Sequence, residues 1–329
     1  MGVTIQQIAV KAGVSKATVS RVLNGLAVKY ETEQKVKAIM EKMEYRPHRF
    51  ARGLAASHKT GFLGVVTPSL NPYVAAVITG MEEEAQRHGK LLTLATFPTG
   101  SNEEREVIQT MTNPPVVDGL LFFLPSPQME GLIKRLLQHK FPMVVASERR
   151  FENLVSAVII DNLNGAKQAT EYLISKGHRR IGYINGRPEM SDSVDRMEGY
   201  RIALREAGIS FDENLIQPGL YDIKSGTEAA AKFLGMSNPP TAVFAANDGM
   251  AIGVLKALHS LKKEGAFAVM GFDDIEMASY VTPSLTTVGY DLHELGRQAV
   301  HKLIRQIQGE EKVQSTLQLK THLVVRESA

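Results

Sequence analysis

The amino-acid sequence predicts an α/β protein with a small helical head at its N-terminus and two doubly wound parallel-sheet lobes after it. Two short helical patterns flank a glycine-containing turn within residues 3–25. From Gly61 onward, short apolar runs alternate with helical stretches, as in a parallel sheet that helices cover on both faces. The alternation begins again after residues 159–161, and this predicts a second α/β unit of similar size.

The composition is that of an ordinary globular protein. The chain has 329 residues, of which 43% are hydrophobic and 22% are charged, and this length is enough for two or three domains. Cysteine is absent, which excludes disulfides, thiol nucleophiles and cysteine metal sites. No run approaches the length of a membrane span, and the polar N-terminus has no apolar signal core. We therefore expect a cytoplasmic protein without a membrane segment.

Basic residues are concentrated at the N-terminus. Residues 1–60 hold eleven Lys and Arg against four Asp and Glu, a net charge of +7, whereas the rest of the chain has a net charge of −4. A small basic module on a mildly acidic body is typical of a protein that binds nucleic acid through that module.

Three apolar stripes at helical spacing predict three short helices in the head. Ser15 stands at the start of the second helix, where its hydroxyl can cap a backbone N–H. The third helix covers about 32–43, and Pro47 stops it because the residue before proline avoids helical angles. The stripes are Ile5, Ile8, Ala9 and Ala12; Val19, Val22 and Leu23; and Val36, Ile39, Met40 and Met43.

A helix, a turn with Gly13 and a second helix form the plan of a helix-turn-helix that reads DNA. The outward face of the second helix carries side chains that suit base edges and phosphates better than a core. A solvated helix face is the alternative interpretation, but the coincidence with the basic charge favours DNA. These outward residues are Lys16, Ala17, Thr18, Ser20 and Arg21.

In the two α/β units, the carboxyl ends of the strands are predicted to face a shared crevice, where such sheets bind ligands. The predicted strands are 62–67, 91–96, 120–124 and 143–146 in the first unit, and 181–184, 242–245 and 267–271 in the second. The predicted helices are 74–88, 103–111, 129–138, 163–175, 193–207, 224–234 and 249–259.

Several short segments occur in a specific order and spacing: 14–24 (VSKATVSRVLN), 45–47, 51–55, 117–120, 177–182, 240–244, 247–251 and 271–274. In this order they resemble the LacI/GalR family of bacterial transcription repressors over nearly the whole chain. The resemblance implies a DNA-binding head, a hinge helix and a core like that of a periplasmic sugar-binding protein. In this family the last helix and strand cross back between the lobes. The implied parts are 1–46 for the head, 47–58 for the hinge helix, 59–161 and 291–318 for the first lobe, and 162–290 and 319–329 for the second.

The resemblance also implies roles for the head and hinge. Arg21 matches a base-reading arginine, which can make a bidentate contact to guanine, and Lys16 and Ala17 occupy the variable specificity positions. Leu54 matches a leucine that wedges into the minor groove at the operator centre, where the bend brings more protein against DNA. Packing of Leu54 against its dimer mate is the alternative. The implied DNA-binding set is Thr4, Ser15, Lys16, Ala17, Thr18, Ser20, Arg21, Asn24, Arg49, Ala51, Arg52 and Leu54.

In the crevice, Arg196, Asn247 and Asp273 match the family's effector ligands. An arginine fork, an amide and a carboxylate suit a sugar, a sugar acid or a sugar phosphate, because each binds two polar groups at once. Asn247 beside Asp248 resembles the sugar-responsive members, although Asp248 can instead cap the helix that begins there. The implied effector set is Tyr73, Ser147, Arg196, Tyr221, Asn247 and Asp273, with core packing as the alternative for both tyrosines.

A few positions depart from the family pattern. Lys29 stands where a serine usually caps the third helix, and Glu33 stands where arginine is common, so phosphate contacts there are expected to differ. Ser147 and Glu148 replace the usual aspartate at the end of the fourth strand, which changes that ligand position.

The predicted function is that of a repressor whose affinity for DNA depends on a small-molecule effector. We expect a homodimer that binds a palindromic operator, because the chain has no leucine-heptad tail like the one with which some members form tetramers. The effector would act through its different affinity for two states. No phosphate loop, nucleophile elbow or HExxH motif occurs, so we expect neither an enzyme nor a cofactor nor a metal. The alternatives are a carbon-catabolite-type regulator controlled by a protein partner and a solute-binding protein without a regulatory role.

Overall fold

The computed structural model describes residues 3–23, 26–43, 45, 60–96, 102–112, 116–311 and 314–329, without the side chains of 102–105 and 107. The chain forms two compact units. The head unit comprises Met1–Phe62 and Thr110–Asp118, and the core unit comprises Leu63–Gln109 and Gly119–Ala329. In the described part of the chain, no helix is both long enough and apolar enough to cross a bilayer.

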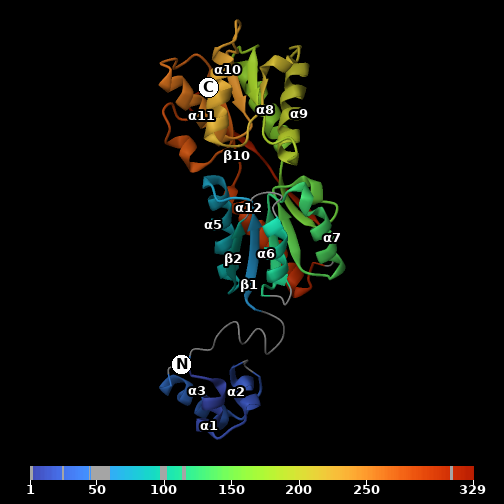
Figure 1. Cartoon of the computed structure of the whole chain (residues 1–329), viewed down its shortest axis with the longest axis vertical. Helices are drawn as coiled ribbons and strands as arrows, with labels where there is room; N and C mark the ends of the chain where they lie inside the picture. The colour runs from blue at the N-terminus through green and yellow to red at the C-terminus, as the bar shows by residue number, and fades with distance from the viewer. Residues whose placement is uncertain are drawn as a thin grey trace. The chain divides into compact units, whose positions relative to one another are not determined.

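Three helices surround a small apolar core in the head: α1 (Ile5–Ala12), α2 (Lys16–Leu23) and α3 (Tyr30–Lys42), drawn in blue in Figure 1. The predicted third helix is shifted by no more than two residues at either end. The predicted apolar stripes supply this core. Its buried members are Ile8, Ala9, Ala12, Val19, Val22 and Val36, with Ile5, Leu23, Ile39, Met40 and Met43 packed against them.

Local hydrogen bonds and one glycine define the turn between α1 and α2. Gly13 ends α1 with a φ of 65°, a left-handed conformation that glycine adopts without strain. The Ser15 hydroxyl accepts the Thr18 N–H at 3.0 Å, which confirms the predicted cap of α2. At the start of α1, Thr4 and Gln7 form a capping box, and this arrangement satisfies two N–H groups that the helix leaves free.

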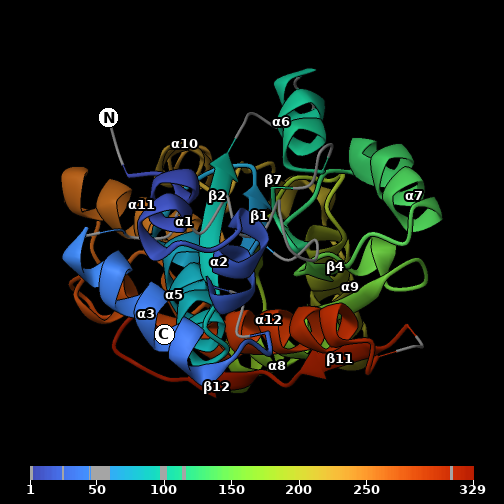
Figure 2. The same cartoon turned by 90° about the horizontal axis from the view of Figure 1, so that it is seen from below.

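The first lobe of the core unit is built on a six-stranded sheet in the order β11-β5-β4-β3-β1-β2. Strands β1, β3, β4, β5 and β11 run parallel. Helices α5 and α12 lie on one face of this sheet, and α6 and α7 lie on the other (Figures 1 and 2). The elements are β1 (Phe62–Thr67), α5 (Pro72–Arg87), β2 (Leu91–Thr96), α6 (Asn102–Thr112), β3 (Gly119–Phe123), α7 (Glu130–Gln138), β4 (Met143–Ala146), β5 (Ser156–Ile160), α12 (Leu292–Gln308) and β11 (Thr316–Leu319).

The second lobe repeats this plan with the strand order β12-β10-β9-β8-β6-β7. Strands β6, β7, β8, β9 and β10 run parallel, and β12 runs antiparallel to β10. Helices α8 and α9 pack against each other, as do α10 and α11. The elements are α8 (Asn162–Ser175), β6 (Ile181–Ile184), α9 (Ser191–Glu206), β7 (Ile216–Gln217), α10 (Ile223–Leu234), β8 (Ala242–Ala245), α11 (Asp248–Ser260), β9 (Ala268–Asp273), β10 (Thr286–Gly289) and β12 (His322–Val324). The described part of the core unit also contains four short 3-10 helices: η1 (Pro127–Met129), η2 (Arg149–Phe151), η3 (Glu213–Leu215) and η4 (Glu276–Ser279).

The chain passes between the lobes after β5, after β10 and after β11. Every residue of β3, β4, β6 and β8 is buried, which explains why these strands read as continuous apolar runs.

Strand β10 was missing from the prediction because it begins with two threonines. Thr286 and Thr287 are nevertheless fully buried. The Thr286 hydroxyl accepts the Arg326 N–H at 2.9 Å, and the Thr287 hydroxyl donates to Asp248 at 2.5 Å. A polar side chain with such partners can be buried in a core. The search for continuous apolar runs therefore did not identify this strand.

Candidate functional site

The DNA-reading face predicted for α2 is open to solvent. Lys16, Ala17 and Arg21 are exposed, while Val19 and Val22 on the same helix are buried in the head core. The helix is therefore amphipathic in the sense that base reading requires, with its core contacts on one side and its predicted base contacts on the other.

Three hydroxyls of the predicted DNA-binding set have partners within the head. The Ser15 and Thr18 hydroxyls lie 2.9 Å apart, and the Thr4 hydroxyl accepts the Gln7 N–H at 3.3 Å. Ser20 is half-buried. A hydroxyl has one donor and two acceptor lone pairs, so these groups retain some capacity for a phosphate.

The two departures near α3 have visible local consequences. Lys29 occupies the N-cap position of α3 and makes no side-chain cap bond, as its identity predicts. The Glu33 carboxylate pairs with Lys37 one turn later at 2.7 Å. At this position, where the family commonly has arginine, Glu33 therefore places a carboxylate that pairs with a lysine of the same helix. The other predicted DNA-binding residues, Asn24, Arg49, Ala51, Arg52 and Leu54, lie outside the described residues, and their roles stay predictions.

In the core unit, a continuous chain of polar side chains joins the two lobes at the carboxyl ends of their strands. Ser147 follows β4, and its hydroxyl lies 3.1 Å from that of Tyr73 in α5. The Tyr73 hydroxyl lies 3.1 Å from that of Tyr290, which donates to Asp273 at 3.2 Å. Asp273, at the end of β9, also accepts from Arg196 of α9 at 3.0 Å. Four predicted effector residues thus belong to one network, and Tyr290 connects them.

Every nitrogen of the Arg196 guanidinium donates a hydrogen bond, although the residue is only 2% exposed. Nε donates to Asn162 at 2.9 Å, Nη1 donates to the Ala246 carbonyl, and Nη2 donates to Asp273. The guanidinium also lies over the Phe272 ring, 3.7 Å from its centre, a contact that strengthens where water is excluded. The arginine is therefore a rigid, oriented fork among the strand ends of the second lobe.

The ion pair between Arg196 and Asp273 lies in a poorly solvated environment. Burial raises the pKa of Asp273 to about 6, while Arg196 acts to lower it. Burial also acts against the charge of Arg196, but the carboxylates of Asp273 and Asp192 raise the pKa of that guanidinium above its usual value. A ligand hydroxyl can accept from the guanidinium and donate to the carboxylate, so this pair has the chemistry to bind a polyol.

The remaining predicted effector residues contact each other. Asn247 donates from Nδ2 to the Tyr221 carbonyl at 3.1 Å, and its Oδ1 accepts the Met250 N–H at 3.0 Å. The Tyr221 ring packs on Gly186, where an added Cβ would lie 2.1 Å from the ring. Asn247 thus has two structural partners in addition to its predicted ligand role.

The interpretation of Asp248 as a helix cap is wrong. Helix α11 begins at Asp248, one residue before the predicted start, so that Asn247 is the cap. Asp248 is fully buried and accepts from the Thr287 hydroxyl and, at 2.8 Å, from the Ile275 N–H. Its carboxylate ties α11 to β10 and to the segment after β9.

Strained backbone marks the same edges of the two sheets. Among the described residues, five other than glycine have a left-handed backbone at or after strand ends: Leu124 (φ 54°), Ser147 (63°), Tyr221 (65°), Asp273 (108°) and Asp274 (52°). Such conformations cost about 1–3 kcal/mol each and cluster at functional sites. Three of the five, Ser147, Tyr221 and Asp273, belong to the effector set that the family resemblance implies.

A second set of contacts between the lobes, which we call the latch, consists of Glu148, Arg149, Ser191 and Asp195. Arg149 in η2 makes a bidentate ion pair with Asp195 of α9, at 2.9 and 2.6 Å. The Arg149 N–H donates to the Ser191 hydroxyl at 3.0 Å, and the Ser191 N–H donates to Glu148 at 3.2 Å. Glu148 is buried at the N-terminus of α9, where the helix dipole favours an anion. Glu148, one of the residues that depart from the family pattern, therefore makes a contact between the lobes.

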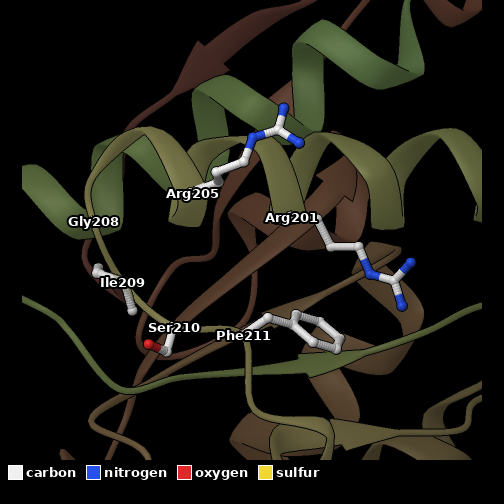
Figure 3. A pocket seen from close by; sticks show the side chains of 6 residues that line it. All are labelled: Arg201, Arg205, Gly208, Ile209, Ser210 and Phe211. Carbon is white, nitrogen blue, oxygen red and sulfur yellow. The ribbon is translucent and has the colours of Figure 1, made fainter.

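A surface pocket of the second lobe lies away from this network (Figure 3). Arg201 stacks on Phe211, with its guanidinium carbon 4.6 Å from the ring centre. The guanidinium groups of Arg201 and Arg205 point in different directions in Figure 3, so they do not converge on one ligand. No predicted effector residue lines this pocket, whose other members are Gly208, Ile209 and Ser210.

Sequence reasoning missed two members of the network, Tyr290 and Asn162. Asn162 comes directly after residues 159–161, where the second unit was predicted to begin. Its position just after a strand could have identified it as a candidate site residue. Tyr290 follows the unpredicted strand β10, and no local pattern marked it.

Comparisons with known proteins agree with this architecture. Residues 4–48 match the family of bacterial regulatory proteins named lacI, and residues 170–329 match a periplasmic binding protein-like domain. The chain is 32% identical to the HTH-type transcriptional repressor CytR of Escherichia coli strain K12, over 99% of this chain and 96% of that protein. The chain belongs to the LacI family. It is therefore a DNA-binding repressor of transcription with a helix-turn-helix head and two parallel-sheet lobes, as predicted.

Two solved structures of LacI-family proteins resemble this one over almost its full length. A complex of the transcriptional regulator CelR with cellobiose is 32% identical, with a TM-score of 0.77 over 99% of this chain and all of that one. A Lac repressor dimer, bound to operator and to the anti-inducer ONPF, is 26% identical, with a TM-score of 0.87 over all of this chain and 99% of that one. The matched relatives are regulators, in agreement with the expectation that this LacI-family protein is not an enzyme.

Proposed function

We propose that this protein acts as a cytoplasmic homodimer whose two heads bind a palindromic operator, and that a sugar-like molecule in the crevice changes its affinity for DNA. The dimer and the operator follow from the geometry of a helix-turn-helix, because one head offers few base contacts and two heads can reach successive major-groove faces. The Lac repressor dimer on its operator supports this arrangement by analogy.

The observation that carries the effector proposal is the polar network from Ser147 to Arg196. It brings hydroxyls, a carboxylate and a guanidinium fork to the strand ends of both lobes, with hydrogen-bond distances between 3.0 and 3.2 Å. A ligand that bonds to groups from both lobes would favour one lobe arrangement over another. Its effect on DNA binding then equals its differential affinity for the two states.

The chemistry of the network favours a hydroxyl-rich ligand. Hydroxyls can replace the hydrogen bonds that these side chains now exchange with one another, and the rings of Tyr73 and Tyr221 are aromatic groups of the kind that can stack on a sugar face. The cellobiose complex of CelR provides a sugar precedent on the same fold. The carboxylate of a sugar acid or the phosphate of a sugar phosphate would accept hydrogen bonds from the Arg196 guanidinium.

A ligand screen followed by DNA binding tests the proposal. Thermal unfolding of the full chain would be measured with sugars, sugar acids and sugar phosphates, and operator binding would then be titrated with and without each stabilising compound. We expect one compound class to raise the melting temperature and to change the operator affinity. Stabilisation without any change in operator affinity would contradict the switch. The absence of a stabilising compound would favour control by a protein partner.

Leu54 is the predicted minor-groove wedge, and its removal tests how the dimer uses the operator. Leu54→Ala should weaken operator binding by about tenfold to a hundredfold, because a wedge supports a bend worth on the order of a few kcal/mol. Binding to non-specific DNA should change little. Leu261→Ala, at an exposed leucine that follows α11, serves as the control. Equal losses on both kinds of DNA would argue for a purely structural role of Leu54.

A further inference from the structure

A cluster of three metal-ligand side chains lies on the first lobe, outside the crevice. Glu84 and His88 stand one turn apart on α5, and His301 comes from α12. Glu84 Oε1 lies 3.1 Å from His88 Nε2 and 3.7 Å from His301 Nδ1. All three donor atoms lie within 4.8 Å of one another.

The close crossing of the two helices explains why these side chains meet. An added Cβ at Gly80 would lie 2.0 Å from the His293 carbonyl oxygen, and one at Gly296 would lie 2.1 Å from the Val77 carbonyl oxygen. The two backbones are therefore in direct contact, one turn before Glu84 on α5. The rigid crossing holds the cluster in place before any ligand arrives, which lowers the cost of binding.

We propose that Glu84, His88 and His301 bind one divalent transition-metal ion of the zinc class. In a tetrahedral zinc site, metal–ligand distances of about 2.0–2.2 Å correspond to ligand–ligand separations of roughly 3.3–3.5 Å. Two of the separations in this cluster, 3.1 and 3.7 Å, bracket that value. Two imidazoles and one carboxylate are also a ligand set that favours zinc, cobalt, nickel or copper over magnesium or calcium.

Room for a solvent ligand exists beside the cluster. A depression in the surface is lined by Glu84, Arg87, Glu294, Arg297, Gln298 and His301. With three protein ligands, a water molecule from this side would complete the four-coordinate shell.

The charges around the cluster permit a cation. Glu84 is buried and supplies the carboxylate of the cluster. Its second oxygen accepts from Arg87 at 3.0 Å, an outer-shell partner that orients the ligand. The other nearby arginine, Arg297, pairs with Glu83, Asp291 and Glu294.

The competing interpretation is a set of ion pairs in which protonated His88 and His301 neutralise Glu84. It requires charged imidazoles, whereas a metal requires neutral ones. The two interpretations therefore differ in whether zinc binds to these three side chains.

Metal titration of the full chain, without an affinity tag and after treatment with a chelator, tests the proposal. Calorimetry with zinc chloride should give one site per chain, and cobalt chloride should produce the visible absorption of a four-coordinate ion. His301→Ala should lower the zinc affinity at least tenfold, since even the loss of an outer-shell partner costs about 10- to 100-fold. Magnesium chloride should have no effect.

His293→Ala is the matched control, because His293 is also on α12, is 44% exposed against 49% for His301, and pairs with Glu83 instead of Glu84. It should leave zinc binding unchanged. Melting curves without metal should be the same for both variants, which separates the loss of a ligand from a loss of folding. An unchanged zinc affinity in His301→Ala, an equal loss in His293→Ala, or no zinc binding by the unmodified protein would overturn the proposal.

Discussion

Arg196 illustrates what a single buried residue contributes to this protein. Its guanidinium bonds to Asn162, Ala246 and Asp273 and stacks on Phe272. These contacts connect α9 with the beginning of α8 and with the ends of β8 and β9. A charge with this many partners positions the strand ends of the second lobe relative to one another, whatever ligand the crevice binds.

At the residue scale, Arg196→Met should lower the free energy of unfolding by about 3–5 kcal/mol, because it leaves the Asp273 carboxylate buried without its cation. Adding Asp273→Asn to that variant should restore part of the loss, since the uncompensated charge is then gone. Urea unfolding of the unmodified protein, both single variants and the double variant measures the coupling. Strictly additive losses would contradict the ion-pair account.

The crossing of α5 and α12 is the corresponding feature at the scale of elements. Gly80 and Gly296 bring the two backbones into contact, and the second helix reaches this place only after the chain has passed through the second lobe as far as β10. The helices meet through carbonyl groups and Cα atoms, so the packing tolerates no side chain there.

Gly296→Ala should therefore destabilise the core unit by about 1–3 kcal/mol, because the new methyl group would meet the Val77 carbonyl and force the helices apart,. Gly131→Ala is the control. Gly131 is exposed in α7, and its Cβ would meet nothing within 4 Å, so the change should be neutral or stabilising by up to about 1 kcal/mol. Thermal unfolding compares the two, and equal effects would mean that the close approach has no energetic importance.

At the scale of the whole core unit, the two lobes meet through three chain crossings, the polar network and the latch. Only the crossings are covalent. The latch and the network consist of hydrogen bonds and ion pairs, which can break and form again as the lobes move. The latch also occupies the N-terminus of α9, the helix that carries Arg196, so the contacts between the lobes and the proposed ligand site share an element.

Asp195→Asn should loosen the latch without unfolding either lobe. Arg149 is 48% exposed and Asp195 is 13% exposed in their side chains, so the pair is worth about 1 kcal/mol or less. We expect hydrogen exchange of the Ser191 and Arg149 amides to rise by up to about fivefold. Exchange should stay constant in Glu228→Gln, which removes an exposed pair on α10. Unchanged exchange at both amides would show that the latch does not hold the lobes together.

The helices and strands of this protein were largely predictable, because local patterns encode them. Buried strands such as β4 and β8 are continuous apolar runs in the sequence. The start of α2 was predictable because a serine, Ser15, stands at the cap position. The errors had physical causes as well. Strand β10 was not predicted because it begins with two buried threonines and not with an apolar run. The cap of α11 was assigned to Asp248 and not to Asn247 because the helix begins one residue earlier than predicted.

The basic helix-turn-helix head and the two α/β lobes follow from the amino-acid sequence alone, because periodicity, capping and charge within short windows of the chain encode them. Which polar side chains meet depends instead on how the elements pack. Tyr73 and Tyr290, Arg149 and Asp195, and Glu84 and His301 are distant in the sequence and belong to different elements. Their encounters depend on strand order, on chain crossings between the lobes and on the close approach of α5 and α12, none of which a local pattern specifies.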